Sequence, residues 1–291
     1  MLAGCGGSAR TKSASTVPFT APSTRLVDGS RPPYITGLAV NPADHSLLLA
    51  TNRGLYRISA DGHHSQTIAA RARAGSRVGS FGQRVSSLAF IHDGELLGSG
   101  HPNGTARDLP PFLGVLESSD NGRNWTAIAR VGFSDLNVLV VSGSTVYGFD
   151  TLLGGVVASY DSGRTYVERA SPPGAFVLDL AIDPHANHHL IASTESAIFS
   201  SPDGGSTWRR ISSGEESRLA WGTAGLYRAD ADQSLLTSSD GGMSWRLVGK
   251  LPRAPGKLVE MADGRLYAAL TDGSIVTSRD AGRSWKALFA P

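Results

Sequence analysis

The 291-residue chain has a single cysteine, Cys5, so no disulfide can form within it. It also lacks a run of about 20 apolar residues, which would predict a membrane-spanning helix. No charge dominates, because 27 Lys and Arg residues against 25 Asp and Glu residues give a net charge of +2. Without a basic run interleaved with aromatic residues, we expect no nucleic-acid partner. A Gly-rich phosphate loop, a thiol metal motif and a Ser/His/Asp elbow are missing too, so we expect neither cofactor nor metal.

Glycine is abundant, with 35 residues, and this favours many short strands joined by tight turns. One pattern recurs along the chain, Ser-x-Asp-x-Gly-x-x-Trp/Tyr. Its five copies are Ser118, Asp120, Gly122 and Trp125; Ser159, Asp161, Gly163 and Tyr166; Ser201, Asp203, Gly205 and Trp208; Ser238, Asp240, Gly242 and Trp245; and Ser278, Asp280, Gly282 and Trp285. Successive copies lie 37 to 42 residues apart. A period near 40 with four short strands per unit is typical of a propeller blade.

A sixth, degenerate copy precedes these five. It keeps Ser59 and Asp61 but has His63 at the position of the glycine and Gln66 at that of the aromatic residue. Six units predict an all-β fold, a six-bladed β-propeller of four-stranded antiparallel blades over residues 34–291. Because the last unit already contains four strands, we expect blade one to pack on blade six, with Arg25–Val27 as a candidate edge strand.

Each residue of the pattern has a structural role. The Asp accepts backbone N–H bonds across a tight turn, the Gly supplies a positive φ, and the aromatic ring packs between neighbouring sheets. The pattern resembles the Asp-box (BNR) repeat of sialidases, sortilin and many bacterial surface propellers. This resemblance implies that the boxes lie on the rim, away from any active site, so we expect their Asp residues to be structural rather than catalytic.

The segment from Ile35 to Trp125 resembles a narrower group, the actinobacterial Asp-box lipoproteins that are labelled glycosyl hydrolases or exo-sialidase-like proteins. The similar stretches are residues 37–42, 50–57, 99–102, 108–111 and 114–118. The chain departs from this group in blade one. Where relatives often have His-x-His-Gly it has Tyr34-Ile35-Thr36-Gly37, and Asn52 replaces another histidine. Of the histidines that the resemblance implies, only His101 remains.

The first residues, Leu2-Ala3-Gly4-Cys5, resemble the lipobox of bacterial lipoproteins, in which the cysteine thiol takes a diacylglyceryl group. The charged and apolar parts of a signal are missing, and a start codon upstream of Met1 would explain this. We expect residues 1–5 to be the remnant of a lipoprotein signal and residues 6–33 a flexible tether, since Gly, Ser, Thr, Ala and Pro prevail there. The propeller would then sit on the outer face of the cell membrane, anchored only by lipid. The alternative is a cytosolic protein with a chance match.

The face opposite the box turns carries the connections between blades, and we expect ligands there, over the central channel. Four carboxylates from successive blades are weak catalytic candidates: Asp150, Glu195, Asp230 and Asp272. The candidates for ligand binding are Arg53, His101, Arg107, Asp108 and Arg218. His185, His188 and His189 are predicted to occupy a surface turn rather than a metal site.

Two functions remain open at this point. A sialidase needs an arginine triad and a Tyr–Glu pair, and neither motif can be recognised. Another glycosidase could use two of the four carboxylates, but they are equally well explained as turn residues. We therefore expect a monomeric propeller that binds a glycan or a cell-surface protein at its channel face. The alternative is an exo-sialidase-like glycoside hydrolase acting on surface or environmental glycans.

Overall fold

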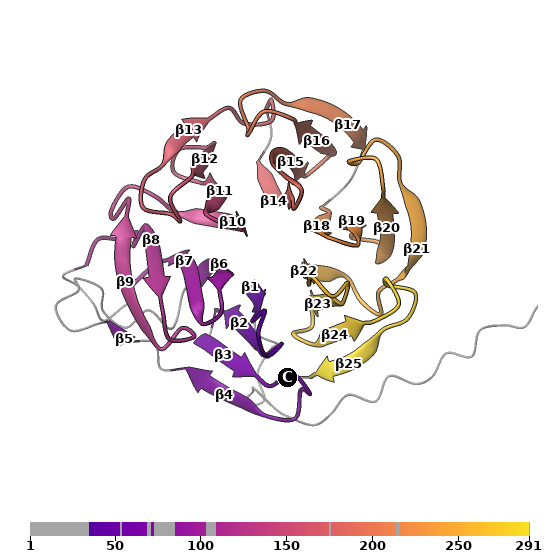
Figure 1. The fold of residues 1–291 in the computed structure, drawn as a ribbon, viewed down its shortest axis with the longest axis horizontal. Helices are drawn as coiled ribbons and strands as arrows, with labels where there is room; N and C mark the ends of the chain where they lie inside the picture. Colours follow the sequence, from indigo (N-terminus) through magenta and orange to yellow (C-terminus); the bar gives the residue numbers. More distant parts are fainter. Residues whose placement is uncertain are drawn as a thin grey trace, which may run out of the picture.

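A ring of six β-sheets surrounds a central channel (Figure 1). The computed structural model describes residues 35–52, 54–68, 71–72, 85–102, 109–174, 176–213 and 216–290. All regular structure in this part of the chain is strand, and no helix there could cross a membrane. The predicted six-bladed β-propeller is confirmed. Arg25–Val27, the tether and Cys5 lie outside the described residues.

Each blade takes four consecutive strands, which pair antiparallel from the channel outwards. Blade 1 has β1 (Ile35–Val40), β2 (Leu47–Thr51), β3 (Gly54–Ile58) and β4 (Ser65–Ile68); blade 2 has β6 (Val85–His92), β7 (Glu95–Gly100), β8 (Val115–Ser118) and β9 (Asn124–Ala129); blade 3 has β10 (Leu136–Ser142), β11 (Thr145–Asp150), β12 (Gly155–Ser159) and β13 (Val167–Arg169). The other half follows the same order. Blade 4 has β14 (Val177–Asp183), β15 (Ala186–Thr194), β16 (Ala197–Ser201) and β17 (Arg209–Ser213); blade 5 has β18 (Arg218–Gly222), β19 (Gly225–Ala229), β20 (Ser234–Ser238) and β21 (Arg246–Lys250); blade 6 has β22 (Pro255–Glu260), β23 (Leu266–Leu270), β24 (Ile275–Ser278) and β25 (Lys286–Phe289).

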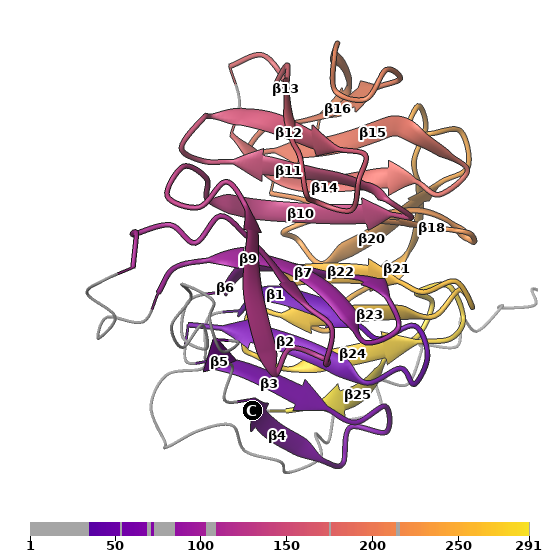
Figure 2. The same cartoon turned by 60° about the vertical axis from the view of Figure 1, so that its left-hand side comes forward.

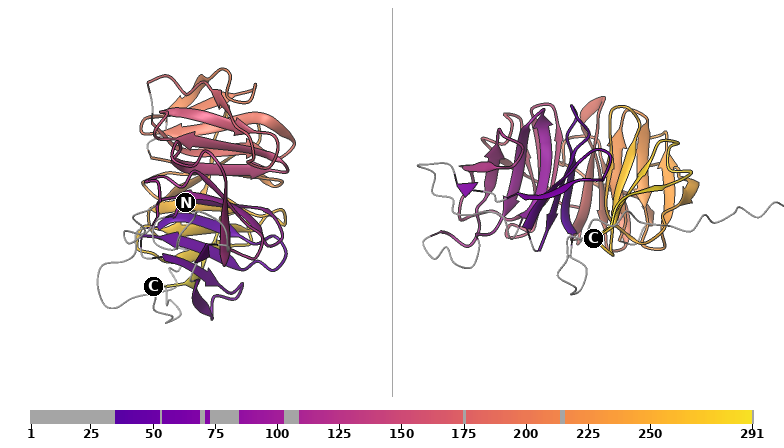
Figure 3. Two further views of the ribbon diagram at one scale, coloured as in Figure 1. Left: turned by 90° about the vertical axis from the view of Figure 1, so that its left-hand side faces the viewer. Right: turned by 90° about the horizontal axis from the view of Figure 1, so that it is seen from below.

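The strands run from one face of the disc to the other (Figure 3). Each sheet twists as strands do, so the outer strand β9 crosses its blade at a steep angle to β6 and β7 (Figure 2). A short strand that the repeat did not predict, β5 (Arg71–Ala72), pairs parallel with β9 and gives blade 2 a fifth strand. It belongs to the insertion between the degenerate first box and the second.

The hydrophobic core is divided into six clusters, one at each interface between neighbouring blades. The ring closes through the cluster that joins blades 1 and 6, in which Leu49 and Ile58 meet Tyr267 and Phe289, all of them buried. The predicted packing of blade one on blade six is confirmed. The box aromatics join these clusters as well, and Trp125 is completely buried between blades 1 and 2.

The box turns are held by the hydrogen bonds that the pattern predicts. In blade 2 the Ser118 hydroxyl donates to Asp120 Oδ1 at 3.0 Å and accepts the N–H of Gly122 at 3.0 Å. Asp120 Oδ1 also accepts the N–H of Asn124 at 2.8 Å. Such bonds lower the pKa of the box carboxyls, to about 2 in Asp203, so these groups stay ionised and engaged in the turn.

The box glycine has a second role, which the sequence pattern did not reveal: it seats each turn against the preceding blade. A Cβ at Gly282 would lie 2.0 Å from Leu235 Cδ2 of blade 5, and one at Gly242 would lie 2.9 Å from Ile211 Cδ1 of blade 4. In the degenerate box the repeat placed His63 at the glycine position, and the structure corrects this assignment. Gly62 has the positive φ, 76°, and packs against β25 of blade 6. This turn is two residues shorter, since Ile58 pairs with Ser65 whereas Glu117 pairs with Thr126.

We expect Gly62→Ala to destabilise the ring by about 2–4 kcal/mol, since it combines a left-handed φ with a steric clash. The added Cβ would lie 1.8 Å from the Leu288 carbonyl oxygen, which is backbone and cannot rotate away. Gly143→Ala is the matched control, because its φ is 59° and nothing lies within 4 Å of the added atom. It should cost only about 1 kcal/mol. Equal losses in urea unfolding would contradict a closure that depends on Gly62.

Candidate functional site

The propeller has two distinct faces. The box turns share one face with the turns between first and second strands: the Asn121 N–H donates to Gly94 O at 3.0 Å, and the Gly204 N–H donates to His188 O at 2.7 Å. We call this side the Asp-box face. The opposite side, the connection face, carries the turns between second and third strands and the passages between blades.

Two of the four candidate carboxylates form hydrogen bonds within the loops of the connection face. Asp150 is fully buried and accepts hydrogen bonds from Arg130 Nη2 at 3.2 Å and from the Ser134 hydroxyl. Asp230 accepts from Arg228 Nη2 at 2.9 Å and from the Ser217 hydroxyl at 2.6 Å. Both networks join a turn to the passage that leads into the same blade.

The other two candidates, Asp272 and Glu195, lie in turns of other blades. Asp272 forms an ion pair with Arg253 Nε at 2.7 Å and accepts the N–H of Ser274, as a turn residue does. Glu195 is exposed in the turn between β15 and β16. None of the four lines the central channel. The channel wall is therefore formed by other residues than these four carboxylates.

The predicted ligand-binding residues fall in three places. Arg53, Arg107 and Asp108 lie outside the described residues. His101 lies on the connection face, where Nδ1 is 3.0 Å from Pro111 O and Nε2 is 3.5 Å from Asp135 Oδ1. Burial raises the pKa of Asp135, but the hydrogen bonds from His101, Thr151 and Ser86 outweigh it, and the net pKa is lowered. Arg218 begins the inner strand of blade 5, beside the channel.

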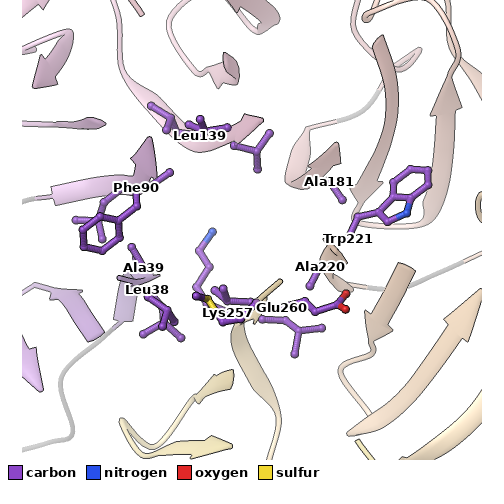
Figure 4. A pocket seen from close by; sticks show the side chains of 18 of the residues that line it. Leu38, Ala39, Phe90, Leu139, Ala181, Ala220, Trp221, Lys257 and Glu260 are labelled. Atoms are coloured by element: carbon purple, nitrogen blue, oxygen red, sulfur yellow. The ribbon is translucent and has the colours of Figure 1, made fainter. Parts of the chain in front are cut away.

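The central channel contains a hollow with a volume of about 540 Å³ (Figure 4). Inner strands of all six blades line it, and the lining continues to His45 and Asp263 in turns of the Asp-box face. Its wall presents polar and apolar surface in similar amounts. The labelled apolar side chains in Figure 4 are Leu38, Ala39, Phe90, Leu139, Ala181, Ala220 and Trp221.

The sequence analysis missed the charged residues of the channel, among them Asp179 and Lys257. In five of the six blades the register of the inner strand shifts after its first residue, and the next paired residues are Gly37, Ser87, Val138, Asp179 and Lys257. These bulges place Asp179 and Lys257 at equivalent levels of the ring. A charged residue within an otherwise apolar inner strand was the signal that could have revealed them.

Glu260 lies at the Asp-box end of the channel and links blade 6 to blade 5. Its two carboxylate oxygens accept the N–H groups of Gly222 at 2.8 Å and Ala224 at 3.0 Å. Burial nevertheless dominates, and it raises the pKa of Glu260 to about 7.

The raised pKa of Glu260 predicts a pH-dependent stability. Between the ordinary value of 4.5 and about 7, the folded protein holds a proton that the unfolded chain has released, so stability should fall as pH rises through this window. Glu260→Gln, which cannot ionise, should flatten that fall in melting temperatures recorded from pH 4.5 to 8. Glu168→Gln, at an exposed glutamate of β13, is the control and should leave the profile unchanged. An unaltered profile in Glu260→Gln would refute the assignment.

An exposed apolar patch occupies the connection face of blade 3. The patch consists of Phe133, Leu152, Leu153 and Phe176, which are 79%, 49%, 42% and 45% exposed. Their loops are tied together: Thr151 N–H donates to Asp135 O at 3.0 Å, and the Ser171 hydroxyl donates to Gly154 O at 3.4 Å. These hydrogen bonds hold apolar side chains in a patch exposed to water.

His188 and His189, which were predicted to occupy a surface turn, lie in β15, and only His185 lies in the turn before it. A Ser–His–Asp set that the sequence did not predict includes His189. His189 Nε2 is 3.0 Å from Ser200 Oγ, and its Nδ1 is 3.6 Å from Asp183 Oδ2. The neighbouring hollow between blades 4 and 5 is lined by His189 and Asp183, but not by Ser200. The Ser200 hydroxyl therefore orients the imidazole of His189. This imidazole also packs edge-on against Trp221, with the two ring centroids 4.9 Å apart.

Comparisons with known proteins agree with this architecture. Residues 166–290 match the family model described as photosynthesis system II assembly factor YCF48. No curated protein matches the chain. The match and the ring together confirm a BNR-type β-propeller, as the Asp-box resemblance predicted.

Solved structures are similar in fold at low sequence identity. YCF48 from Cyanidioschyzon merolae is 16% identical, with a TM-score of 0.52, over 88% of this chain and 85% of that one. An ancestral GH74 enzyme is 11% identical, with a TM-score of 0.56, over 93% of this chain but only 40% of its own length. A structure of YCF48 bound to D1 peptide is 16% identical over 72% of this chain and 67% of that one, with a TM-score of 0.47.

Proposed function

We propose that this propeller binds a protein partner through its connection face. The observation that carries the proposal is the apolar patch of Phe133, Leu152, Leu153 and Phe176. Large apolar side chains exposed on neighbouring loops are unfavourable in water and mark interaction sites on proteins. An aromatic residue as exposed as Phe133 is typical of an anchor that becomes buried in a partner.

The match to an assembly-factor family supports a protein partner, because such factors act by binding other proteins. The glycan and glycosidase alternatives gain less support from the described residues. Glycosidases other than the sialidase type commonly use two carboxyl groups on either side of the scissile bond. The carboxylates of Asp150 and Asp230 are instead engaged by arginine and serine side chains of their own loops.

We further propose that the propeller is held at the outer face of the cell membrane by a lipid on Cys5. The support is the lipobox-like Leu2-Ala3-Gly4-Cys5 and the composition of residues 6–33. Mass spectrometry of protein expressed from an upstream start should find lipidated Cys5 as the new N-terminus. An unmodified Met1 would overturn this proposal.

The patch can be tested by affinity capture from membranes of the producing organism. We expect the double variant Phe133→Ser, Leu152→Ser to lose its captured partner at least tenfold relative to wild type, since two apolar anchors are removed. The matched control is Val167→Ser, Leu247→Ser, because these side chains are 48% and 57% exposed on outer strands.

The control should keep the partner, and both variants should melt like wild type. Equal capture by wild type and the patch variant would refute binding through the patch. Turnover of a fluorogenic glycoside panel, sialosides included, by the wild-type protein would support the hydrolase instead.

A further inference from the structure

We propose that the central channel binds an amphipathic organic anion, with its carboxylate or phosphate head at Lys257 and its apolar body against the inner strands. The site goes beyond partner binding, because its residues are distinct from those of the connection-face patch. It lies where six strands meet, and its residues come from blades far apart in the sequence.

Lys257 supplies a cation that is only partly neutralised. Its side chain runs from β22 into the open centre of the ring with the nitrogen foremost (Figure 4). The nearest carboxylate oxygen is Asp179 Oδ1 at 3.9 Å, which exceeds hydrogen-bond length. An ammonium group has three donors, and the described residues give this one no hydrogen bond. A ligand that entered the channel could accept those donors.

Asp179 is itself engaged by the backbone. Its Oδ2 accepts the N–H of Leu219 at 3.0 Å, and its Oδ1 accepts the N–H of Leu180 at 3.2 Å. These amides share the negative charge that would otherwise face Lys257. Burial has the largest effect on Lys257 and, together with the positive charge of Arg218, outweighs Asp179, so the net pKa of Lys257 is lowered.

Arg218 adds a second positive charge near the same level. Its Nε donates to Gly256 O at 2.8 Å, and Nη1 donates to Ser217 O at 3.5 Å, so its hydrogen-bond partners among the described residues are neutral carbonyls. Arg218 does not itself line the hollow, but its positive charge acts on Lys257 and opposes the effect of Asp179. An incoming anion would therefore meet a favourable field in a site of lowered dielectric.

The other charges of the channel do not compete for this position. Both oxygens of Glu260 are occupied by backbone N–H groups, and its carboxylate points away from Lys257 (Figure 4). His45 and Asp263 lie at the Asp-box end, 3.8 Å apart, and pair with each other. Lys257 is thus the charge that remains available to a ligand.

The wall of the channel determines the rest of the ligand. Leu38, Phe90 and Leu139 lie around the hollow, with the small residue Ala39 beside Leu38 and Ala181 near Ala220 and Trp221 (Figure 4). A volume of about 540 Å³ lies within the range of small-molecule sites. A small inorganic anion would leave these apolar side chains in contact with water, which is unfavourable. The channel therefore favours an anion with an apolar body that covers them.

Isothermal titration calorimetry with four eight-carbon probes separates head from tail. Octanoate and octyl phosphate test the two anionic heads, octanol tests the tail alone, and octylammonium tests attraction to Asp179. We expect at least one anion to bind the full chain at least tenfold more tightly than octanol, and octylammonium to bind weakest. Tighter binding of octylammonium, or no binding of either anion, would overturn the proposal.

Two channel variants should change anion affinity in opposite directions. Lys257→Met removes the charge but keeps an apolar side chain of similar length, and should weaken binding about tenfold. Asp179→Asn removes the opposing charge while keeping an oxygen for Leu219 N–H, and should strengthen binding several-fold, which misfolding could not imitate. Lys250→Met, at an exposed lysine of β21, is the control and should bind like wild type. Equal affinity in Lys257→Met and wild type would refute the site.

Discussion

Every blade of this ring depends on the seating of a box turn against the blade before it. A four-stranded sheet with apolar side chains on both faces cannot bury them alone, and the six interface clusters show how the ring solves this. The box glycine allows the turn to approach the neighbouring sheet within contact distance. At the junction of blades 1 and 6 the box is degenerate, but Gly62 makes the same close contact with the neighbouring blade. Closure thus uses the same contact as every other interface.

Because the box turns on one face pack the blades together, the loops on the other face can differ from blade to blade. The Asp-box face repeats, because its turns carry the packing, whereas the loops of the connection face vary from blade to blade. Phe133 and Phe176 occupy such loops and are exposed, although their neighbours Asp135 and Phe149 are buried. The proposed partner surface therefore rests on a rigid base of hydrogen-bonded loops, as functional loops commonly do.

The charges of the chain fall into two groups with different physical roles. Those in turns are neutralised locally, as Asp150 is by Arg130 and Asp272 by Arg253. Those on inner strands face the channel and have few local partners, as the 3.9 Å separation of Lys257 and Asp179 shows. Local pairing stabilises loops, whereas incomplete pairing in a hollow leaves charge for a ligand.

The sequence by itself determined the fold, because the box pattern is local: a serine, an aspartate and a glycine within five residues build one turn, and the period counts the blades. It also predicted which blades meet at closure. The residues of the candidate site were harder to predict from the sequence. Asp150 and Asp230 could be named as carboxylates in loops, but their burial and arginine partners depend on residues brought together by the fold. Lys257 and Asp179 lie 78 positions apart in the chain. Only the tertiary structure decided that they share one channel, because ring closure brings strands of separate blades to a common axis.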